Sequence, residues 1–591
     1  TTAAVIRVFT CPDTTYRVKA GTEPPVGSAF GVEVGQATAV HGAHDHLFQD
    51  VRLWFKYTAG AVGTAPVIDG PLPTTIECVE TGEQFQFELR ANTIERPTVA
   101  VAMVLDQSGS MGWDAGTSGL TRLAVLKDAA KLFVTVIPDG NALGIVRFDQ
   151  NAYPPNDPTF PGMPITRIVS AAERATARAV IDAHGAHGDT SVGDGLIMGH
   201  SQLLTVAPGD YSNTAMLLFT DGIENQPESI ANAIAAGATD SRVHVIGLGN
   251  EFQVNTAALN TLSRNNLLLS GLLTPSTDDF FRVKKLFLQI LAAVTNTSIV
   301  RDPIGFINTG TRIKIPFQLS ETDISCRAIL LTDYPVVELS VEAPDGTVID
   351  AASGAAAGVT FERDGDTQTA SFVAPLTLIG QADATGEWNV ILEVDEKRYK
   401  RLLSILRDKD PRAADALAGR GARFCASVHT FSNLRMVAEI SQDGYEPGSN
   451  LTLRARLTEY GVPVDGRAHV SALLEYPDGT PTTLPLNEVG PGLFECTLPA
   501  TMPGLYRFTI TAAGVTFRGA PFTREQLLTA AVFRKIDPPT DPGKGSTGDL
   551  CTLISCFLDE NVTKPEFRKR LKEWGIDTDS FQKCIDRHCR D

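Results

Sequence analysis

Apolar and polar residues follow two different patterns along this chain, and the change between them divides it into segments. Between residues 98 and 300, unbroken apolar runs such as 101–105 and 215–219 predict strands buried on both faces, as in a parallel sheet. The stretches 122–137 and 280–294 repeat apolar residues at helical spacing. Strands that alternate with helices indicate an α/β domain over residues 98–300.

The N-terminal segment, residues 1–97, has the period of two that marks half-buried strands. Phe85, Phe87 and Leu89 alternate with polar residues, and residues 51–57 predict another strand. Because clusters of Pro and Gly separate these runs, we expect this segment to fold as a β-sandwich.

Two further β-rich segments follow the α/β region, at residues 301–420 and 421–536. Each contains a tight-turn sequence, at 342–347 and at 475–480, ahead of a late strand. The repeated plan predicts two sandwiches in series. The stretch 445–457 resembles the entry of bacterial and macroglobulin-type immunoglobulin-like domains, which implies that the second sandwich is an immunoglobulin-like spacer or interaction module.

The two ends of the α/β domain are expected to lie close together, as they do in many domains. The strands that follow residue 300 could then pair with residues 51–97. On this hypothesis the α/β domain is an insertion in a sandwich built from both flanking segments.

Residues 537–591 form a separate tail, in which a Pro- and Gly-rich linker at 537–548 precedes helical patterns. Its four cysteines are Cys551, Cys556, Cys584 and Cys589. A tail of this size has too small a core to fold without cross-links, so we expect two disulfides that join two helices. A zinc site that includes His588 is the alternative.

Five oxygen-bearing side chains lie where predicted strands end or a predicted helix begins. They are Asp106, Ser108, Ser110, Thr190 and Asp221. The first three follow strand 101–105, and the last follows strand 215–219. The carboxyl ends of parallel strands meet at one edge of the sheet, where open α/β sheets bind ligands. Hydroxyl and carboxylate oxygens suit Mg²⁺, Ca²⁺ or Mn²⁺, and this set leaves room for a carboxylate from another molecule.

These residues stand in three motifs: Asp-x-Ser-x-Ser at 106–110, Gly-Asp-Thr-Ser-x-Gly-Asp-Gly at 188–195, and Thr-Asp-Gly at 220–222. Together they resemble the metal-ion-dependent adhesion site of the von Willebrand factor A (VWA) family, over roughly residues 99–300. The resemblance implies a doubly wound, Rossmann-like sheet and ligand binding through the metal. It also implies that all five metal ligands of the family are present.

Four residues near these motifs are candidates for contact with a partner. Trp113 and Asp114 lie in the Gly-rich loop after the first motif, and His184 and His187 precede Thr190. An exposed aromatic side chain beside a metal is a natural contact residue. Packing of Trp113 against its own loop, and histidines in an ordinary surface loop, are the alternatives.

The charge of the chain narrows the choice of partner. Its 51 Lys and Arg residues stand against 69 Asp and Glu residues, a net charge of −18, which argues against nucleic acid and anionic membranes. No apolar run approaches the roughly 18 residues of a membrane span. Nine cysteines spread along the chain favour an oxidising compartment. We therefore expect an extracellular or cell-surface protein, with the periplasm as the alternative.

The order of the segments resembles bacterial surface VWA proteins and the later part of calcium-activated chloride channel regulators. The zinc protease motif His-Glu-x-x-His of those regulators does not occur in this chain, so protease activity is not implied.

We expect a protein without catalytic residues that binds an Asp or Glu carboxylate of a protein partner through Mg²⁺, Ca²⁺ or Mn²⁺. The sandwiches would act as spacers or as surfaces for homo- or hetero-assembly. Two other functions stay open: a structural subunit of a larger extracellular assembly or filament, and an intracellular VWA subunit that works with a separate ATPase, as in chelatases.

Overall fold

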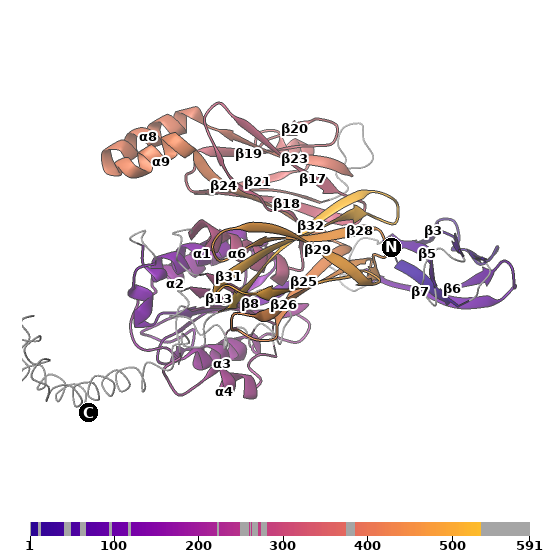
Figure 1. Ribbon diagram of the computed structural model, residues 1–591, viewed down its shortest axis with the longest axis horizontal. Helices are drawn as coiled ribbons and strands as arrows, with labels where there is room; N and C mark the ends of the chain where they lie inside the picture. The colour runs from indigo at the N-terminus through magenta and orange to yellow at the C-terminus, as the bar shows by residue number, and fades with distance from the viewer. Residues whose placement is uncertain are drawn as a thin grey trace, which may run out of the picture.

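The structure of the protein, a computed structural model, describes residues 2–9, 13–40, 49–58, 67–93, 97–115, 120–220, 224–240, 242–248, 259, 262, 270–273, 280–373 and 385–532. An α/β domain and two β-rich domains pack side by side, and an N-terminal β domain projects from one end of the molecule (Figure 1). No helix in these ranges is long and apolar enough to cross a membrane. The predicted cysteine tail at 537–591 and Asp221 lie outside the described residues.

The N-terminal domain consists of two antiparallel sheets around one core that includes Leu53 and Ile76, both fully buried. One sheet has the order β1–β5–β3, formed by β1 (Thr2–Val8), β5 (Gln49–Tyr57) and β3 (Phe30–Val34). The other has the order β4–β2–β6–β7, formed by β4 (Gln36–Ala39), β2 (Thr14–Val18), β6 (Val67–Cys78) and β7 (Gln84–Thr93). The strands predicted at 51–57 and 85–89 are confirmed as β5 and β7.

The α/β domain has a central sheet of the order β10–β9–β8–β12–β13–β14, with β11 beside β9. Its strands are β8 (Val99–Asp106), β9 (Ala142–Phe148), β10 (Ala152–Tyr153), β11 (Met163–Arg167), β12 (Asn213–Thr220), β13 (Arg242–Leu248) and β14 (Ser270–Leu273). The neighbours β9, β8, β12, β13 and β14 are parallel. Every residue of β8 is buried, which explains its unbroken apolar run.

Helices cover both faces of this sheet. The helices are α1 (Arg122–Val136), α2 (Ala171–Asp182), α3 (Val192–Leu203), α4 (Ile230–Ala235) and α6 (Phe280–Val294). Side chains of α1, α2 and α6 share one core with the sheet, and those of α3 and α4 share another on the opposite face. This is the doubly wound arrangement that the resemblance to the VWA family implied.

The third domain packs two sheets around a core that contains Trp388, which is fully buried. One sheet has the order β17–β23–β19–β20, and β21, β22, β18, β24 and β16 form the other side. The strands are β16 (Ile304–Ile307), β17 (Arg312–Leu319), β18 (Asp323–Thr332), β19 (Val337–Glu342), β20 (Val348–Ile349), β21 (Thr360–Asp364), β22 (Thr367–Val373), β23 (Gly386–Val394) and β24 (Ala422–Ser432), and the short helix is α7 (Gly354–Ala357).

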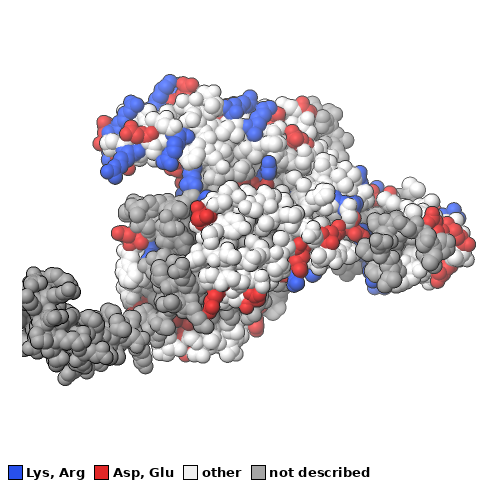
Figure 2. Space-filling model, in the orientation of Figure 1, with Lys and Arg blue, Asp and Glu red and all other residues white. Residues whose placement is uncertain are grey.

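A helical hairpin within the third domain was not expected from the sequence, which predicted a β-rich sandwich over residues 301–420. It consists of α8 (Glu396–Lys409) and α9 (Pro411–Arg420) and carries a cluster of Lys and Arg side chains at one end of the molecule (Figures 1 and 2). Strand β24 follows it and pairs with β18, so by strand pairing the third domain continues to residue 432, beyond the expected boundary at 420.

The fourth domain consists of strands around a core that includes Leu453 and Phe508. They are β25 (Leu434–Gln442), β26 (Ser449–Glu459), β27 (Val462–Pro463), β28 (Ala468–Glu475), β29 (Pro481–Gly490), β30 (Leu493–Ala500), β31 (Gly504–Val515) and β32 (Pro521–Val532). The turns predicted at 342–347 and 475–480 are confirmed as the connections β19–β20 and β28–β29.

The hypothesis that the α/β domain is inserted in a sandwich is wrong. The strand that leaves the α/β domain, β15 (Ser298–Arg301), pairs with β24 and β32, and β16 pairs with β24. Within the described ranges no strand of the N-terminal domain pairs with a strand of another domain. The strands after residue 297 therefore pair with strands that come later in the sequence, because the edges of β24 and β32 lie next to the end of α6.

Candidate functional site

The carboxylate of Asp106 is fixed at the carboxyl edge of the central sheet. Asp106 is the last residue of β8 and is fully buried. Its Oδ1 accepts a hydrogen bond from the backbone N–H of Ser108 (2.7 Å), and its Oδ2 accepts one from the hydroxyl of Thr220 (2.6 Å). Because β8 and β12 are adjacent parallel strands, Thr220 at the end of β12 lies next to Asp106. Both hydrogen bonds favour the charged form of the carboxylate and fix its position at this edge.

The two serines of the first motif lie together in the loop after β8. Their hydroxyl oxygens are 3.1 Å apart, with Ser108 buried and Ser110 half-buried in the 3₁₀ turn Gly109–Gly112. The N–H of Gly109 donates to the carbonyl of Gly188 (2.9 Å), and a Cβ on Gly109 would lie 3.2 Å from that carbonyl. Glycine here allows the serine loop to approach the 188–190 loop closely.

Thr190 is held between two other loops of the same edge. Its N–H donates to the side-chain oxygen of Asn225 (2.8 Å), and the N–H of Asn225 donates back to the Thr190 carbonyl (3.1 Å). The N–H of Ser191 donates to the carbonyl of Asp149 (2.7 Å), which follows β9. The segments after β8, β9 and β12 therefore converge on the loop that carries Thr190.

The chemistry of these side chains fits a hard divalent cation. A carboxylate and three hydroxyl groups offer only oxygen donors, the kind that Mg²⁺, Ca²⁺ and Mn²⁺ prefer. Among the described residues no group of three or more His, Cys, Asp or Glu side chains is arranged to hold a metal. A cation at this edge would therefore depend on the hydroxyl groups of Ser108, Ser110 and Thr190. Asp221 directly follows Thr220 but is not among the described residues.

A polar cluster around Asp149 lies beside these residues, and the sequence analysis missed it. The Oδ2 atom of Asp149 lies 2.9 Å from His187 Nδ1, and its Oδ1 accepts a hydrogen bond from the Tyr153 hydroxyl (2.8 Å). Burial, together with this bond to Asp149, raises the pKa of Tyr153 to about 12. The ring of His187 packs on that of Phe160, with centroids 4.6 Å apart. The signal in the sequence was Asp149 at the end of a buried strand, as for Asp106.

Glu224 is a second acidic residue at this edge that the sequence analysis missed. One of its carboxylate oxygens accepts a hydrogen bond from the N–H of Gly193 at the start of α3 (3.0 Å). Burial raises the pKa of Glu224. Its place three residues after Asp221 in the sequence was the available signal.

The predicted partner-contact residues differ in their exposure. Trp113 is 58% exposed, with the guanidinium of Arg122 5.4 Å from its ring centre. Asp114 is exposed, and its backbone forms an isolated antiparallel β-bridge with Thr121. His187 is half-buried. His184, the other histidine candidate, is buried with Nδ1 3.2 Å from the carbonyl of Val180, so neither partner contact nor a surface-loop position describes it. Burial lowers the pKa of His184 to about 3.

The four cysteines in the described part of the chain are free thiols: Cys78, Cys326, Cys425 and Cys496. The predicted disulfides of Cys551, Cys556, Cys584 and Cys589 fall outside the described residues and stay a prediction.

Residues 100–320 match the family model of the von Willebrand factor type A domain. A search of curated proteins found no match. Among solved structures, the chain is similar to a von Willebrand factor type A protein from Catenulispora acidiphila, with 14% identity, a TM-score of 0.29, and coverage of 67% of this chain and 68% of that one. It is also similar to the pilus adhesin SpaC from Lactobacillus rhamnosus GG (11% identity, TM-score 0.30, 86% and 61% coverage) and to the PilB minor pilin from Streptococcus sanguinis (14%, 0.29, 48% and 88%). The match to the family model identifies residues 100–320 as a von Willebrand factor type A domain.

Proposed function

We propose that this chain is a non-enzymatic binding protein of the cell exterior, whose VWA domain holds one divalent cation and through it binds a carboxylate of a protein partner. Asp106, Ser108, Ser110, Thr190 and Asp221 would be the ligands, with Mg²⁺ as the first candidate and Ca²⁺ or Mn²⁺ as alternatives. When bound, the cation supplies a positive coordination centre with a free position for an anionic oxygen.

The observation that carries this proposal is the convergence of separate loops at one edge of the sheet. The Gly109–Gly188 hydrogen bond joins the serine loop to the Thr190 loop. The Thr220–Asp106 hydrogen bond joins the start of the serine loop to the end of β12. Residues from three distant parts of the sequence are therefore held in one place before any cation binds. Such preorganisation lowers the ordering cost of binding.

The protein around the ligands supports recognition of a partner. The exposed ring of Trp113 lies in the loop that follows Ser110 and offers an apolar contact beside the bound carboxylate. Asp149 and the ring of Phe160 hold His187 next to the Thr190 loop. The β domains would present this face at a distance from the site of attachment or assembly.

Calorimetry of Mg²⁺ and Mn²⁺ binding to the full chain tests the proposal. Asp106→Ala and Ser110→Ala should each weaken or abolish binding. The control is Asp210→Ala. Asp210 is an exposed residue of the loop just before β12, at the edge of the sheet opposite the proposed metal site. Unchanged affinity in Asp106→Ala, with the fold intact by circular dichroism, would show that the cation site is elsewhere.

A second experiment tests the partner. Capture of surface proteins by the immobilised full chain should occur with Mg²⁺, stop with a chelator, and be lost in Ser110→Ala. Capture that continues with the chelator and in Ser110→Ala would refute metal-dependent recognition. It would favour a structural role, which the mass of the native particle would reveal.

A further inference from the structure

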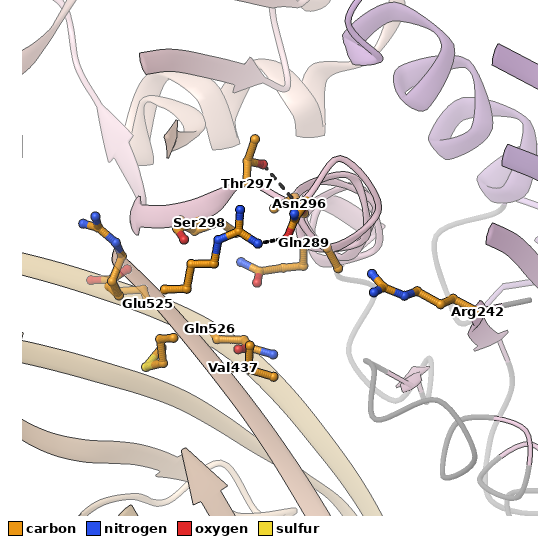
Figure 3. A pocket seen from close by; sticks show the side chains of 14 residues that line it. Arg242, Gln289, Asn296, Thr297, Ser298, Val437, Glu525 and Gln526 are labelled. Carbon is orange, nitrogen blue, oxygen red and sulfur yellow. Dashed lines mark hydrogen bonds between the residues drawn. The ribbon is translucent and has the colours of Figure 1, made fainter. Parts of the chain in front are cut away.

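A cavity of about 350 Å³ lies where the VWA domain meets the fourth domain (Figure 3). The end of α6 and the residues after it, Asn296 to Ser298, form one wall, and strands β25 and β32 form the floor. Arg242, the first residue of β13, lines the cavity from the side of the VWA domain. This volume is at the lower end of the range of small-molecule binding sites.

The floor of the cavity is a seam between two strands that side chains hold together. The side-chain amide of Gln526 in β32 accepts a hydrogen bond from the N–H of Ala438 (2.9 Å) and donates to its carbonyl (3.1 Å). The Nε of Arg524 donates to the carbonyl of Leu434 (3.1 Å). These three hydrogen bonds occupy backbone groups of β25 that a neighbouring strand would otherwise use.

Met436 lies between Leu434 and Ala438, and its backbone N–H and C=O groups point toward the boundary between β25 and β32. Met436 lies opposite Leu457 in the register of β25 and β26. The N–H of Leu457 donates to Gly492, and its carbonyl accepts from Val464. Met436 and Leu457 are therefore a pair without mutual backbone hydrogen bonds, whose N–H and C=O groups point outward. The cavity thus presents a donor and an acceptor beside its charged wall.

Arg435 brings an unbalanced positive charge to the cavity. Its Nη1 donates to Asn296 Oδ1 (2.7 Å) and its Nε to the carbonyl of Ser432 (3.2 Å), both neutral acceptors. Asn296 adopts a positive φ of 56°, a backbone conformation that Asn tolerates better than most residues. Within the described part of the chain no carboxylate forms an ion pair with Arg435, and burial lowers the pKa of its guanidinium.

The other charged residues of the cavity divide into paired and unpaired groups. Arg524 is paired with Asp323 at 2.8 Å, and Glu525 with Arg301 at 2.8 Å. Arg242 forms no ion pair with any described carboxylate and is exposed. Glu525 is thus neutralised by Arg301, whereas the guanidinium groups of Arg435 and Arg242 line the same cavity without an ion-pair partner among the described carboxylates.

Part of the remaining lining is apolar. Ala292 and Ala293 of α6, Ile299 of β15 and Val437 of β25 contribute to the wall. Val437 is 47% exposed. An anion with no apolar part would leave these surfaces hydrated, whereas an apolar body attached to the anion would cover them.

We propose that this cavity binds a small organic anion with an apolar body, such as an aliphatic carboxylate. The anionic group lies against Arg435 and Arg242, where a planar carboxylate matches the guanidinium fork. The apolar body packs on Ala292, Ala293 and Val437. The ligand contacts α6 and β25 at once, so it stabilises the junction of the two domains when bound.

Titration of the full chain with octanoate, octanol, acetate and inorganic phosphate tests this proposal. Calorimetry should detect octanoate binding, and octanoate should raise the Tm. Octanol lacks the charge and acetate lacks the apolar body, so both should bind at least about tenfold more weakly, given the usual strength of a charged hydrogen bond.

Variants locate the site. Arg435→Met should lower octanoate affinity about tenfold or more. Arg456→Met, which removes an exposed arginine from the adjacent strand β26, should leave it unchanged. Val437→Trp narrows the cavity from an exposed position and keeps every charge, so it should also weaken binding even if Arg435→Met fails to fold. Octanoate binding that is absent in the wild type, equal in Val437→Trp, or no tighter than binding of octanol or phosphate would overturn the proposal.

Discussion

Arg524 and Asp323 form an ion pair in which both side chains are only 1% exposed, with Nη2 2.8 Å from Oδ1. The first belongs to β32 of the fourth domain and the second to β18 of the third domain. The Nη2 atom of Arg524 also donates to the hydroxyl of Ser432 (2.9 Å). Neither charge has access to water, so each is neutralised only by the side chain that the other domain contributes.

Arg524→Met is expected to destabilise the chain by about 3–5 kcal/mol, because it leaves the carboxylate of Asp323 buried without its partner. Urea unfolding followed by circular dichroism measures the change. Arg454→Met is the control, because its pair with Glu495 lies at the surface, where water screens it, and should contribute far less. Equal losses in the two variants would contradict this account.

The N-terminal domain is expected to lose its fixed orientation in Phe517→Ala. The ring of Trp54 stacks on Phe517 with centroids 4.2 Å apart, Tyr460 contacts both rings, and an ion pair joins Arg518 to Glu33. Removing the central ring exposes Trp54, which is 4% exposed in the intact chain. Small-angle X-ray scattering should show a larger radius of gyration, and Trp fluorescence should shift to the red. An unchanged scattering profile would mean that other contacts hold this domain.

Two glycines in helices should respond to alanine in opposite directions. A Cβ on Gly193 in α3 would lie 2.2 Å from the carbonyl oxygen of Glu228, so Gly193→Ala should destabilise the VWA domain by about 1–3 kcal/mol. Gly419 in α9 has no atom near such a Cβ, so Gly419→Ala should raise stability by up to about 1 kcal/mol. Thermal unfolding of both variants measures the two signs, and destabilisation by Gly419→Ala would show that α9 is not packed as described.

Stability should fall as the pH is lowered from about 7 toward 4. Burial lowers the pKa of His184 and His429 to about 3 and that of His244 to about 4. The folded chain keeps them neutral, whereas the unfolded chain binds protons below about pH 6.5, so protonation favours unfolding in this window. Each histidine should cost roughly 1.5–2 kcal/mol between pH 6.5 and 5.

Urea unfolding across that pH range checks this expectation. His429→Gln should flatten the dependence, and His469→Gln, which changes a histidine whose side chain is not buried, should leave it as in the wild type. A pH dependence that is the same in both variants would exclude a contribution from His429.

Elements with a strong local pattern of apolar residues were predictable from the sequence. Residues 101–105 of β8 and 215–219 of β12 are buried and apolar, and the polar residues Asp106 and Thr220 mark the ends of these strands. Two of the three predicted metal-binding motifs come directly after those strands. The sequence therefore also predicted the edge of the sheet at which the two motifs lie. By contrast, α8 and α9 were missed even though Asp395 and Asp410 cap them. The signal was present, because Tyr399, Leu402, Leu403 and Leu406 recur at helical spacing in α8 within a stretch rich in Lys and Arg.

Strand pairing across the domain boundaries and the burial of particular polar groups could not be predicted from the sequence. The choice of β24 and β32 as partners of β15 depends on edges that lie more than one hundred residues away in the sequence. The burial of His184 depends on packing of α2, and the cavity at Arg435 exists because α6 ends beside β25. Such features arise from contacts between distant segments, so no local pattern of hydrophobic and polar residues records them.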